Sequence, residues 1–160
     1  MKRRSGFTII EVSLVLAIAG MILMLVFIAL PALQRTTRDT QRREDMASFI
    51  SAIKKYQNNN RGALPTTTGW NDFSVKYTND FKDPSGGTNY VVEAVDCGAS
   101  TKDALCTGAA SYADVDFPNN YKITVVLGAT CDGESAKKAD NPRRVAVLYK
   151  LELGVYCGNT

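Results

Sequence analysis

The sequence predicts an α+β fold in which one long N-terminal helix carries a small antiparallel β-sheet. Residues 12–33 contain no formally charged side chain. As a helix this run would be roughly 33 Å long, enough to cross the roughly 30 Å hydrocarbon core of a bilayer. Three later runs, 90–95, 121–127 and 144–151, are rich in β-branched or alternating apolar residues and predict strands. The order of helix, loop and strands is that of an α+β domain.

The chain divides into four expected segments: a leader at 1–6, a hydrophobic helix at 7–33, an amphipathic helix at 34–58 and a globular domain at 59–160. The amphipathic segment has apolar residues at spacings of three and four, which predicts a face that packs on the sheet. These residues are Met46, Phe49, Ile50, Ile53 and Tyr56. The first helix stop signal is the run 58–62, Asn-Asn-Asn-Arg-Gly, so a single helix is expected from about residue 7 to about residue 57.

The N-terminus combines a basic leader, Lys2-Arg3-Arg4, with a carboxylate at the start of the hydrophobic helix, Glu11. The leader is too short and the apolar run too long for an ordinary secretory signal peptide. A plain signal anchor explains the length and the positive charges but not Glu11. A lone carboxylate beside a membrane segment is costly unless it finds a partner, so Glu11 is interpreted as functional.

Gly6, Phe7 and Glu11, in this frame of basic leader and apolar helix, resemble the N-terminus of type IV prepilins. The six-residue leader and the Phe start resemble the type IVa subgroup, whose fibres serve adhesion, twitching motility and DNA uptake. The resemblance implies a type IV pilin fold, and cleavage between Gly6 and Phe7 by a prepilin peptidase that also methylates the new amine of Phe7. It further implies a membrane-inserted precursor with a cytoplasmic N-terminus, a helical homopolymer on the cell surface and a pilus assembly machinery.

After cleavage, Glu11 would have a cationic partner in the amine of Phe7, whose unperturbed pKa is about 8. The pairing is possible within one helix, where the two residues would be i and i+4, or between neighbouring subunits. The resemblance implies the intersubunit pair, as a device that sets register during assembly, and we favour it over the intrahelix pair.

Gly20 and Pro31 are the irregularities of the hydrophobic helix. Pro31 lacks an amide donor and crowds the carbonyl of Phe27, which predicts a kink or opening near 27–31. In the resembling family a proline nearly one turn earlier marks helix that melts in the filament, so the position of any melting is left open here.

The helix turns strongly polar from 34 to 45. Asp39 precedes Arg42 and Arg43 by three and four residues, which makes helical ion pairs available. A solvated helix face is the favoured interpretation of this band, and intersubunit ion pairs are the alternative.

Residues 58–89 predict a loop-rich region that packs on the domain through Trp70, Phe73, Tyr77 and Phe81. The run 83–90, at the end of this region, resembles the Asp-Pro-x-Gly turn that leads into the first strand of major pseudopilins of type II secretion. A short last strand is expected at 155–157. Segments 98–117 and 128–143 are expected to be surface loops held by cysteines.

The four cysteines, Cys97, Cys106, Cys131 and Cys157, predict two disulfides in an extracytoplasmic domain. Of three possible connectivities we favour Cys97–Cys106 and Cys131–Cys157. A zinc site is disfavoured because the chain has no paired C-x-x-C element and no histidine.

The composition also argues against an enzyme and a cofactor. Without histidine, the Ser/His/Asp and Cys/His arrangements cannot form. The run 132–134 with Asp140 could contribute to a calcium loop, but it does not fit an EF-hand and a solvated loop is favoured. Removing Lys2, Arg3 and Arg4 lowers Lys+Arg from 19 to 16, equal to the 16 Asp+Glu, so net charge gives no case for nucleic-acid binding.

Three functional hypotheses follow. The first is a pilin of a surface filament, and the second is a pseudopilin of a type II secretion or competence system. Long loops and two disulfides favour the first. A membrane-anchored binding module that does not polymerise is the third, and Glu11 argues against it.

Overall fold

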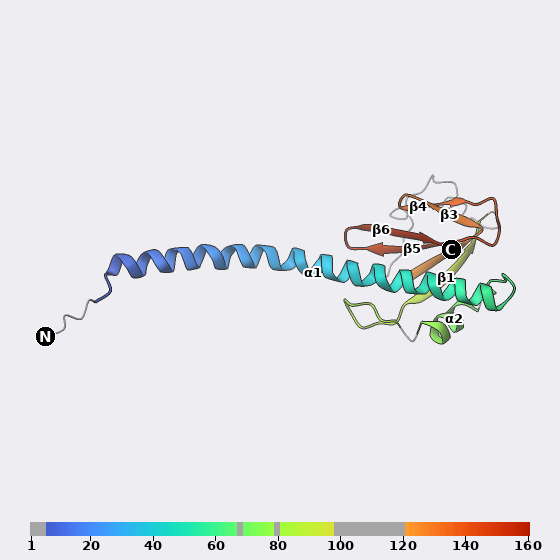
Figure 1. Ribbon diagram of the computed structural model, residues 1–160, viewed down its shortest axis with the longest axis horizontal. Coiled ribbons are helices and arrows are strands. Elements are labelled where there is room, and N and C mark those ends of the chain that lie inside the picture. The colour runs from blue at the N-terminus through green and yellow to red at the C-terminus, as the bar shows by residue number, and fades with distance from the viewer. Residues whose placement is uncertain (1–5, 67–68, 79–80, 98–120) are drawn as a thin grey trace. The chain divides into compact units, whose positions relative to one another are not determined.

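The computed structural model describes residues 6–66, 69–78, 81–97 and 121–160, and the chain forms two compact units, Met1–Thr37 and Arg38–Thr160 (Figure 1). The first helix, α1, spans Ile9–Asn59 and contributes to both units.

In the first unit, the apolar side chains of α1 are exposed all around the helix. Phe7 is 85% exposed, and Phe27 is still 72% exposed more than five turns later. α1 is long and apolar enough to cross a membrane, and its most apolar stretch has no buried residue. A helix that is apolar on every side has no favourable contact with water, so this unit needs lipid or other protein around it.

The second unit is built on a four-stranded sheet of order β1-β2-β5-β6 (Figure 1). Its strands are β1 (Val91–Asp96), β2 (Lys122–Leu127), β5 (Val145–Leu151) and β6 (Gly154–Asn159). The predicted strands at 90–95, 121–127, 144–151 and 155–157 are therefore confirmed to within a few residues, the last being extended at both ends.

The sheet is mixed, because β1 pairs with β2 in parallel while β2–β5 and β5–β6 are antiparallel. The sequence had predicted antiparallel strands throughout, and the β1–β2 pair corrects that prediction. Parallel neighbours need a crossover of a dozen or more residues. The segment 97–121 between β1 and β2 is long enough for one, whereas the short turn between β5 and β6 permits only a hairpin.

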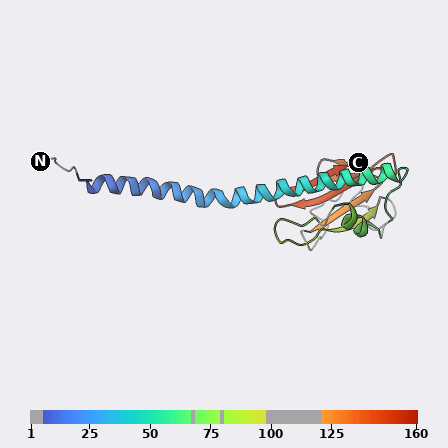
Figure 2. The ribbon, with the colours of Figure 1, turned by 60° about the horizontal axis from the view of Figure 1, so that its bottom comes forward.

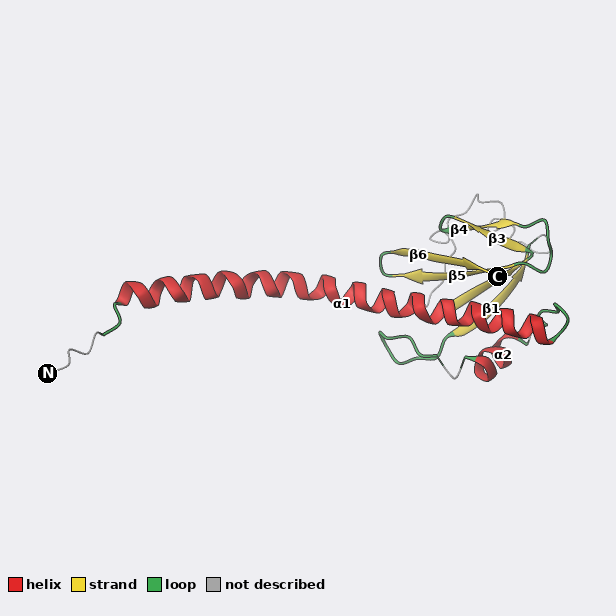
Figure 3. Ribbon diagram, in the orientation of Figure 1, coloured by secondary structure: helices red, strands yellow, loops and turns green. Residues whose placement is uncertain are grey.

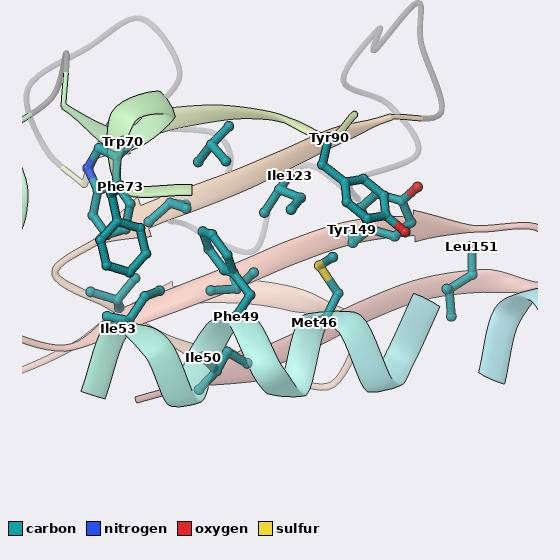
Figure 4. Packing of buried hydrophobic residues seen from close by; sticks show 14 residues of the cluster. Met46, Phe49, Ile50, Ile53, Trp70, Phe73, Tyr90, Ile123, Tyr149 and Leu151 are labelled. Carbon is teal, nitrogen blue, oxygen red and sulfur yellow. The ribbon is translucent and has the colours of Figure 1, made fainter. Parts of the chain in front are cut away.

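One face of the sheet packs against the second half of α1, as predicted (Figure 2). Met46, Phe49 and Ile53 of α1 are completely buried, and Ile50 nearly so. They meet Ile123 of β2 and the inward-facing residues of β5 (Figure 4), and Val125 of β2 belongs to the same core. Tyr56 is half-buried against this core. The inward-facing residues of β5 are Val145, Val147, Tyr149 and Leu151.

The other face of the sheet is covered by a hairpin that the sequence analysis assigned to loop. Its strands are β3 (Ala129–Asp132) and β4 (Ser135–Lys138), and they lie beside β5 and β6 (Figure 1). Ala136 contributes to a second apolar cluster with Val126 and Leu148. The two-residue turn begins with Gly133 at φ +63°, the geometry that a Gly-first tight hairpin requires. The loop prediction for 128–143 was therefore wrong for 129–132 and 135–138, whose strands are too short and too polar to show apolar alternation.

A short second helix, α2 (Trp70–Tyr77), follows α1 across a loop (Figure 3). The loop-rich prediction missed it, although the predicted packing of its aromatic residues is confirmed. Trp70 and Phe73 are buried, and the ring of Phe73 meets those of Phe49 and Tyr56 edge-on at centroid distances of 5.8 and 5.5 Å. Tyr77 and Phe81 pack half-buried against the same core.

Candidate functional site: the N-terminal segment and the charged cluster of the domain

The peptide bond between Gly6 and Phe7 lies in non-helical chain just before α1. Both residues are exposed, and a Cβ placed on Gly6 would meet no atom within 4 Å. A protease must bind its substrate as an extended chain, and an open segment ahead of the helix presents this bond without unfolding. Residues 1–5 of the leader lie outside the described residues.

Glu11 forms a capping box with Thr8, which the sequence analysis missed. Thr8 precedes the first residue of α1, and its hydroxyl accepts the amide of Glu11 at 3.4 Å. The Glu11 carboxylate in turn accepts the hydroxyl and the amide of Thr8 at 3.3 and 3.5 Å. The signal was present as Thr-x-x-Glu before an apolar run.

The capping box bears on the expected intrahelix pair. α1 begins at Ile9, so in the uncleaved chain Phe7 is outside the helix and its nitrogen is an amide rather than an amine. The Glu11 carboxylate is therefore held by Thr8 before processing. Which partner it takes after processing stays a prediction.

Gly20 and Pro31 both lie within α1, which remains helical through residues 27–31. A Cβ on Gly20 would meet no atom within 4 Å. The folded chain itself thus places no steric demand on Gly20, and the proposed melting near Pro31 stays a prediction about the filament.

The polar band of α1 contains a buried ion cluster, so the solvated-face interpretation was wrong for two of its residues. Arg42 is 2% exposed, and its guanidinium donates two hydrogen bonds to the carboxylate of Asp83, at 2.8 and 3.2 Å. It also donates to Asp39 at 3.0 Å, the predicted i,i+3 pair, and to the hydroxyl of Ser85. Asp83 is 1% exposed and accepts a further hydrogen bond from Tyr149 at 2.8 Å.

Asp83 opens the turn that the sequence analysis singled out. Its carboxylate accepts the amide of Ser85 at 2.7 Å, and its carbonyl accepts the amide of Gly87 at 2.9 Å. The turn before β1 is therefore fixed to α1 through Arg42 and to β5 through Tyr149.

Asp39 performs the corresponding role at the turn between β5 and β6. Its carboxylate accepts the amides of Glu152 and Leu153 at 3.0 and 3.1 Å. The Glu152 carboxylate forms a two-point ion pair with Arg38 at 2.7 and 3.0 Å. Arg38, Asp39 and Arg42 of α1 therefore hold two loops of the domain, the turn before β1 and the turn between β5 and β6. Sequence patterning could not find Asp83 and Glu152 as partners because they lie far along the chain.

The cluster shifts the pKa values of its members. Burial opposes the charge on Arg42, but hydrogen bonds to Asp83 outweigh it and raise the pKa of Arg42. Burial likewise opposes the Asp83 carboxylate, and the hydrogen bond from Arg42 prevails and lowers the pKa of Asp83. Burial, with a hydrogen bond to Asp83, raises the pKa of Tyr149. Arg42 and Asp83 are therefore charged at neutral pH and Tyr149 is neutral. None of the three groups changes its protonation state near neutral pH, so the cluster has a structural role.

The predicted Cys131–Cys157 disulfide is present and joins β3 to β6. Cys97 is also disulfide-bonded, and its expected partner Cys106 lies outside the described residues. Among the residues that the structure describes, no group of three or more Cys, Asp or Glu side chains could hold a metal ion. Asp132 ends β3, and Gly133 and Glu134 form the hairpin turn.

Residues 1–27 match the model of the prokaryotic N-terminal methylation motif. No curated protein and no solved structure matches the chain. The motif is the signal of the type IV pilin and pseudopilin class, and with the pilin-like α+β fold it makes the chain a type IV pilin-like or pseudopilin subunit. The protein is thus a structural subunit and not an enzyme. The motif implies processing by a prepilin peptidase and filament assembly.

Proposed function

We propose that the protein is a pilin that polymerises through α1 into a type IV pilus on the bacterial cell surface, in a fibre that serves adhesion, twitching motility or DNA uptake. The observation that carries the proposal is an N-terminal methylation motif on a helix whose apolar side chains are exposed on every side. Such a helix is stable in lipid before assembly. Once extracted, it must be covered by copies of itself, in a head-to-tail, open-ended helical stack.

In this proposal cleavage after Gly6 changes the chemistry around Glu11. Before cleavage the carboxylate is held by Thr8 at the helix start. Cleavage creates an amine on Phe7 only four residues away, and subunits in the filament bring one chain's Glu11 to the Phe7 amine of its neighbour. Pairing in a low-dielectric environment offsets much of the desolvation cost of both charges, so only the correct axial register is stable.

A pseudopilin of a type II secretion or competence system is the second candidate. The Asp83-Pro84 turn favours it, because that turn resembles the one preceding the first strand in major pseudopilins and is fixed here by buried hydrogen bonds. The Cys131–Cys157 disulfide favours the surface pilus, since a fibre outside the cell gains from covalent reinforcement. We give the pilus precedence.

Replacing Glu11 tests the assembly step. Glu11→Val should leave membrane insertion and domain folding intact and abolish filaments, because it removes the register contact and adds only apolar surface. Ser13→Ala is the matched control: its hydroxyl donates to the carbonyl of Ile9 within the same helix, and its loss should leave filament yield unchanged. Electron microscopy of negatively stained cells gives the yield. Normal filaments from Glu11→Val would overturn the assembly proposal.

Shearing separates the two candidates. Intact mass and N-terminal sequencing of material sheared from the cell surface should give a chain that begins at methylated Phe7 and is lighter by four hydrogens, for two disulfides. The same processed chain found only in the cell envelope would favour the pseudopilin. A chain that still begins at Met1, confined to membranes, would contradict both.

A further inference from the structure

The β3–β4 hairpin carries opposite charges at its two ends. At its turn, the carboxylates of Asp132 and Glu134 are exposed. At its open end, the side chains of Lys137 and Lys138 are exposed. Within the described ranges, no ion pair involves any of these four side chains. The hairpin therefore presents an acidic turn at one end and a basic pair at the other.

The basic pair borders a surface depression of about 500 Å³ over the connection from β4 to β5. Its charged lining is Lys137, Lys138 and Arg144 with one acid, Asp140. Gly128 fixes the backbone there, since its amide donates to the carbonyl of Arg144 and its carbonyl accepts the amide of Ala139, each at 2.8 Å. We call this the basic depression.

Further cations lie at the same end of the domain. Arg143 precedes Arg144 in the chain, and its carbonyl accepts the side-chain amide of Gln57, near the end of α1, at 2.8 Å. A Cβ placed on Gly62 would lie 3.1 Å from the guanidinium of Arg143, and Arg61 is the preceding residue. Arg61, Arg143 and Arg144 are all exposed. The end of the domain where α1 stops is therefore basic.

The acidic turn lies at the opposite end. A Cβ placed on Gly154, in the β5–β6 turn, would lie 3.0 Å from the carboxylate of Glu134. That turn is also the one held by the ion pair of Glu152 with Arg38, where the domain begins. Glu134 and Lys138 are four residues apart on a strand that rises about 3.3 Å per residue, so roughly 13 Å separate them. The turn of one chain therefore cannot enter that chain's own basic depression.

We propose that the acidic turn of one copy docks in the basic depression of a second copy. The inference rests on the proposed function, in which α1 brings the domains of successive subunits together. Each copy carries both halves of the contact, at opposite ends of one hydrogen-bonded hairpin. The contact is therefore head-to-tail and open-ended, the type of interface that builds a filament rather than a closed dimer.

The charges also determine how two domains align. Burial of α1 is apolar and non-directional, whereas ionic contacts fix register and oppose arrangements that bring like charges together. Two acidic turns or two basic depressions repel each other, so only the head-to-tail alignment is attractive. The mature chain has no net charge, and the attraction between opposite ends is therefore not offset by repulsion between whole subunits.

Reversing the charges of one end tests the contact. K138E/R144E makes both ends of the domain acidic, and D132K/E134K makes both ends basic. Each variant should lower filament yield at least about tenfold, because like charges then meet in the head-to-tail alignment. The chain with all four changes exchanges the signs and should recover most of the wild-type yield. Co-expression of the two defective variants should also give filaments that contain both chains, because their unlike ends alternate.

The matched control is K76E/K150E, which reverses two exposed cations outside the depression. Its filament yield should stay within about twofold of wild type, and Trp70 fluorescence should show every variant folded. Normal yield from both single-end variants would overturn the proposal. So would a four-change chain as defective as the single-end variants.

A cross-link in wild-type filaments tests the same contact without any substitution. A carbodiimide joins a carboxylate directly to an amine, and mass spectrometry of sheared filaments should find Glu134 joined to Lys138. Their separation within one chain is too large for such a bond, so the product reports a neighbouring copy. Filaments without this product would overturn the contact and leave the proposed function intact. Absence of wild-type filaments would overturn the proposed function, and this inference with it.

Discussion

The two units of the chain differ in the exposure of their apolar side chains and in the distance along the chain to the partners of their charged side chains. In the unit that ends at Thr37, large apolar side chains are exposed and the carboxylate of Glu11 is satisfied by a residue three positions away. In the unit that begins at Arg38, two clusters of apolar residues are buried, and the guanidinium of Arg42 is satisfied by Asp83, far along the chain.

The difference shows which unit buries its apolar surface with its own residues and which unit needs other molecules to cover it. A unit whose contacts are all local cannot bury its own apolar surface and depends on lipid or on further copies. The domain has long-range pairs, a core on both faces of its sheet and a disulfide, so its structure is determined by its own residues. Loss of a contact should therefore have a local effect in the first unit and a global one in the second.

The largest effect is expected from Arg42→Met. The change leaves the buried carboxylates of Asp83 and Asp39 without their cation, and breaking a buried pair in this way costs about 3–5 kcal/mol. Urea unfolding of the full chain in detergent micelles, followed by the fluorescence of Trp70, measures the free energy of unfolding. Trp70 is the only tryptophan and is buried in the core, so it reports on the domain.

Arg43→Met is the control for that prediction. Arg43 is the exposed neighbour of Arg42, and its loss should change the free energy of unfolding by less than about 0.5 kcal/mol. Similar costs for the two variants would mean that the cluster does not hold the domain together, and the contrast between the two units would fail.

Sequence patterning located most of the helix and the sheet, and the reasons are physical. The face formed by Met46, Phe49 and Ile53 and the alternation along β5 are period signals that burial imposes directly on the sequence. The β3–β4 hairpin was missed because its strands are four residues each and largely polar. The parallel pairing of β1 with β2 was missed because register depends on a crossover, and strand composition does not record the direction of pairing.

The candidate site divides in the same way. Gly6, Phe7 and Glu11 could be selected from the sequence because their contacts are local and their spacing carries the signal. The pairing of Arg42 with Asp39 could be predicted from their i,i+3 spacing. Its pairing with Asp83 could not, since Asp83 looks like an ordinary turn residue until the fold brings it to α1. The high polarity of residues 34–45 predicted a solvated helix face. Asp39 and Arg42 are buried instead, because each is paired with an opposite charge.

A smaller effect is expected from acid. The pKa of Asp83 is lower in the folded chain than in the unfolded one, so its stabilisation is complete above about pH 4 and is lost as the pH falls through the lowered value. One such proton changes the free energy of unfolding by at most about 1.4 kcal/mol for each pH unit. Asp45, whose pKa is raised by burial, acts in the opposite direction.

Asp83→Asn isolates this contribution, because Asp45 is present in both proteins. The variant should be less stable at pH 7 and should lose less stability than wild type between pH 4 and pH 2. Ser85→Ala keeps the carboxylate and should retain the acid dependence of wild type. Parallel pH profiles for wild type and Asp83→Asn would show that Arg42 does not lower the pKa of Asp83.

The smallest effect is expected from Thr8→Val, which removes the hydroxyl of the capping box. Loss of an N-cap costs about 1 kcal/mol, but here no long-range contact depends on it. The free energy of unfolding of the domain should therefore be unchanged. Amide exchange at Glu11 and Val12, whose amides donate to Thr8, should be about fivefold faster, because only the first turn of α1 opens more often.

Thr8→Ser retains the hydroxyl and should exchange at the rate of wild type. Faster exchange well beyond the first turn, or a shift in the urea midpoint of the domain, would mean that the N-terminal contact is coupled to the rest of the chain. In that case the first unit would contribute to the stability of the domain, besides being covered by lipid or by a neighbouring subunit. Unchanged exchange would instead mean that Glu11 is not held by Thr8 in the uncleaved chain, and that its carboxylate is available for another partner even before the bond after Gly6 is cut.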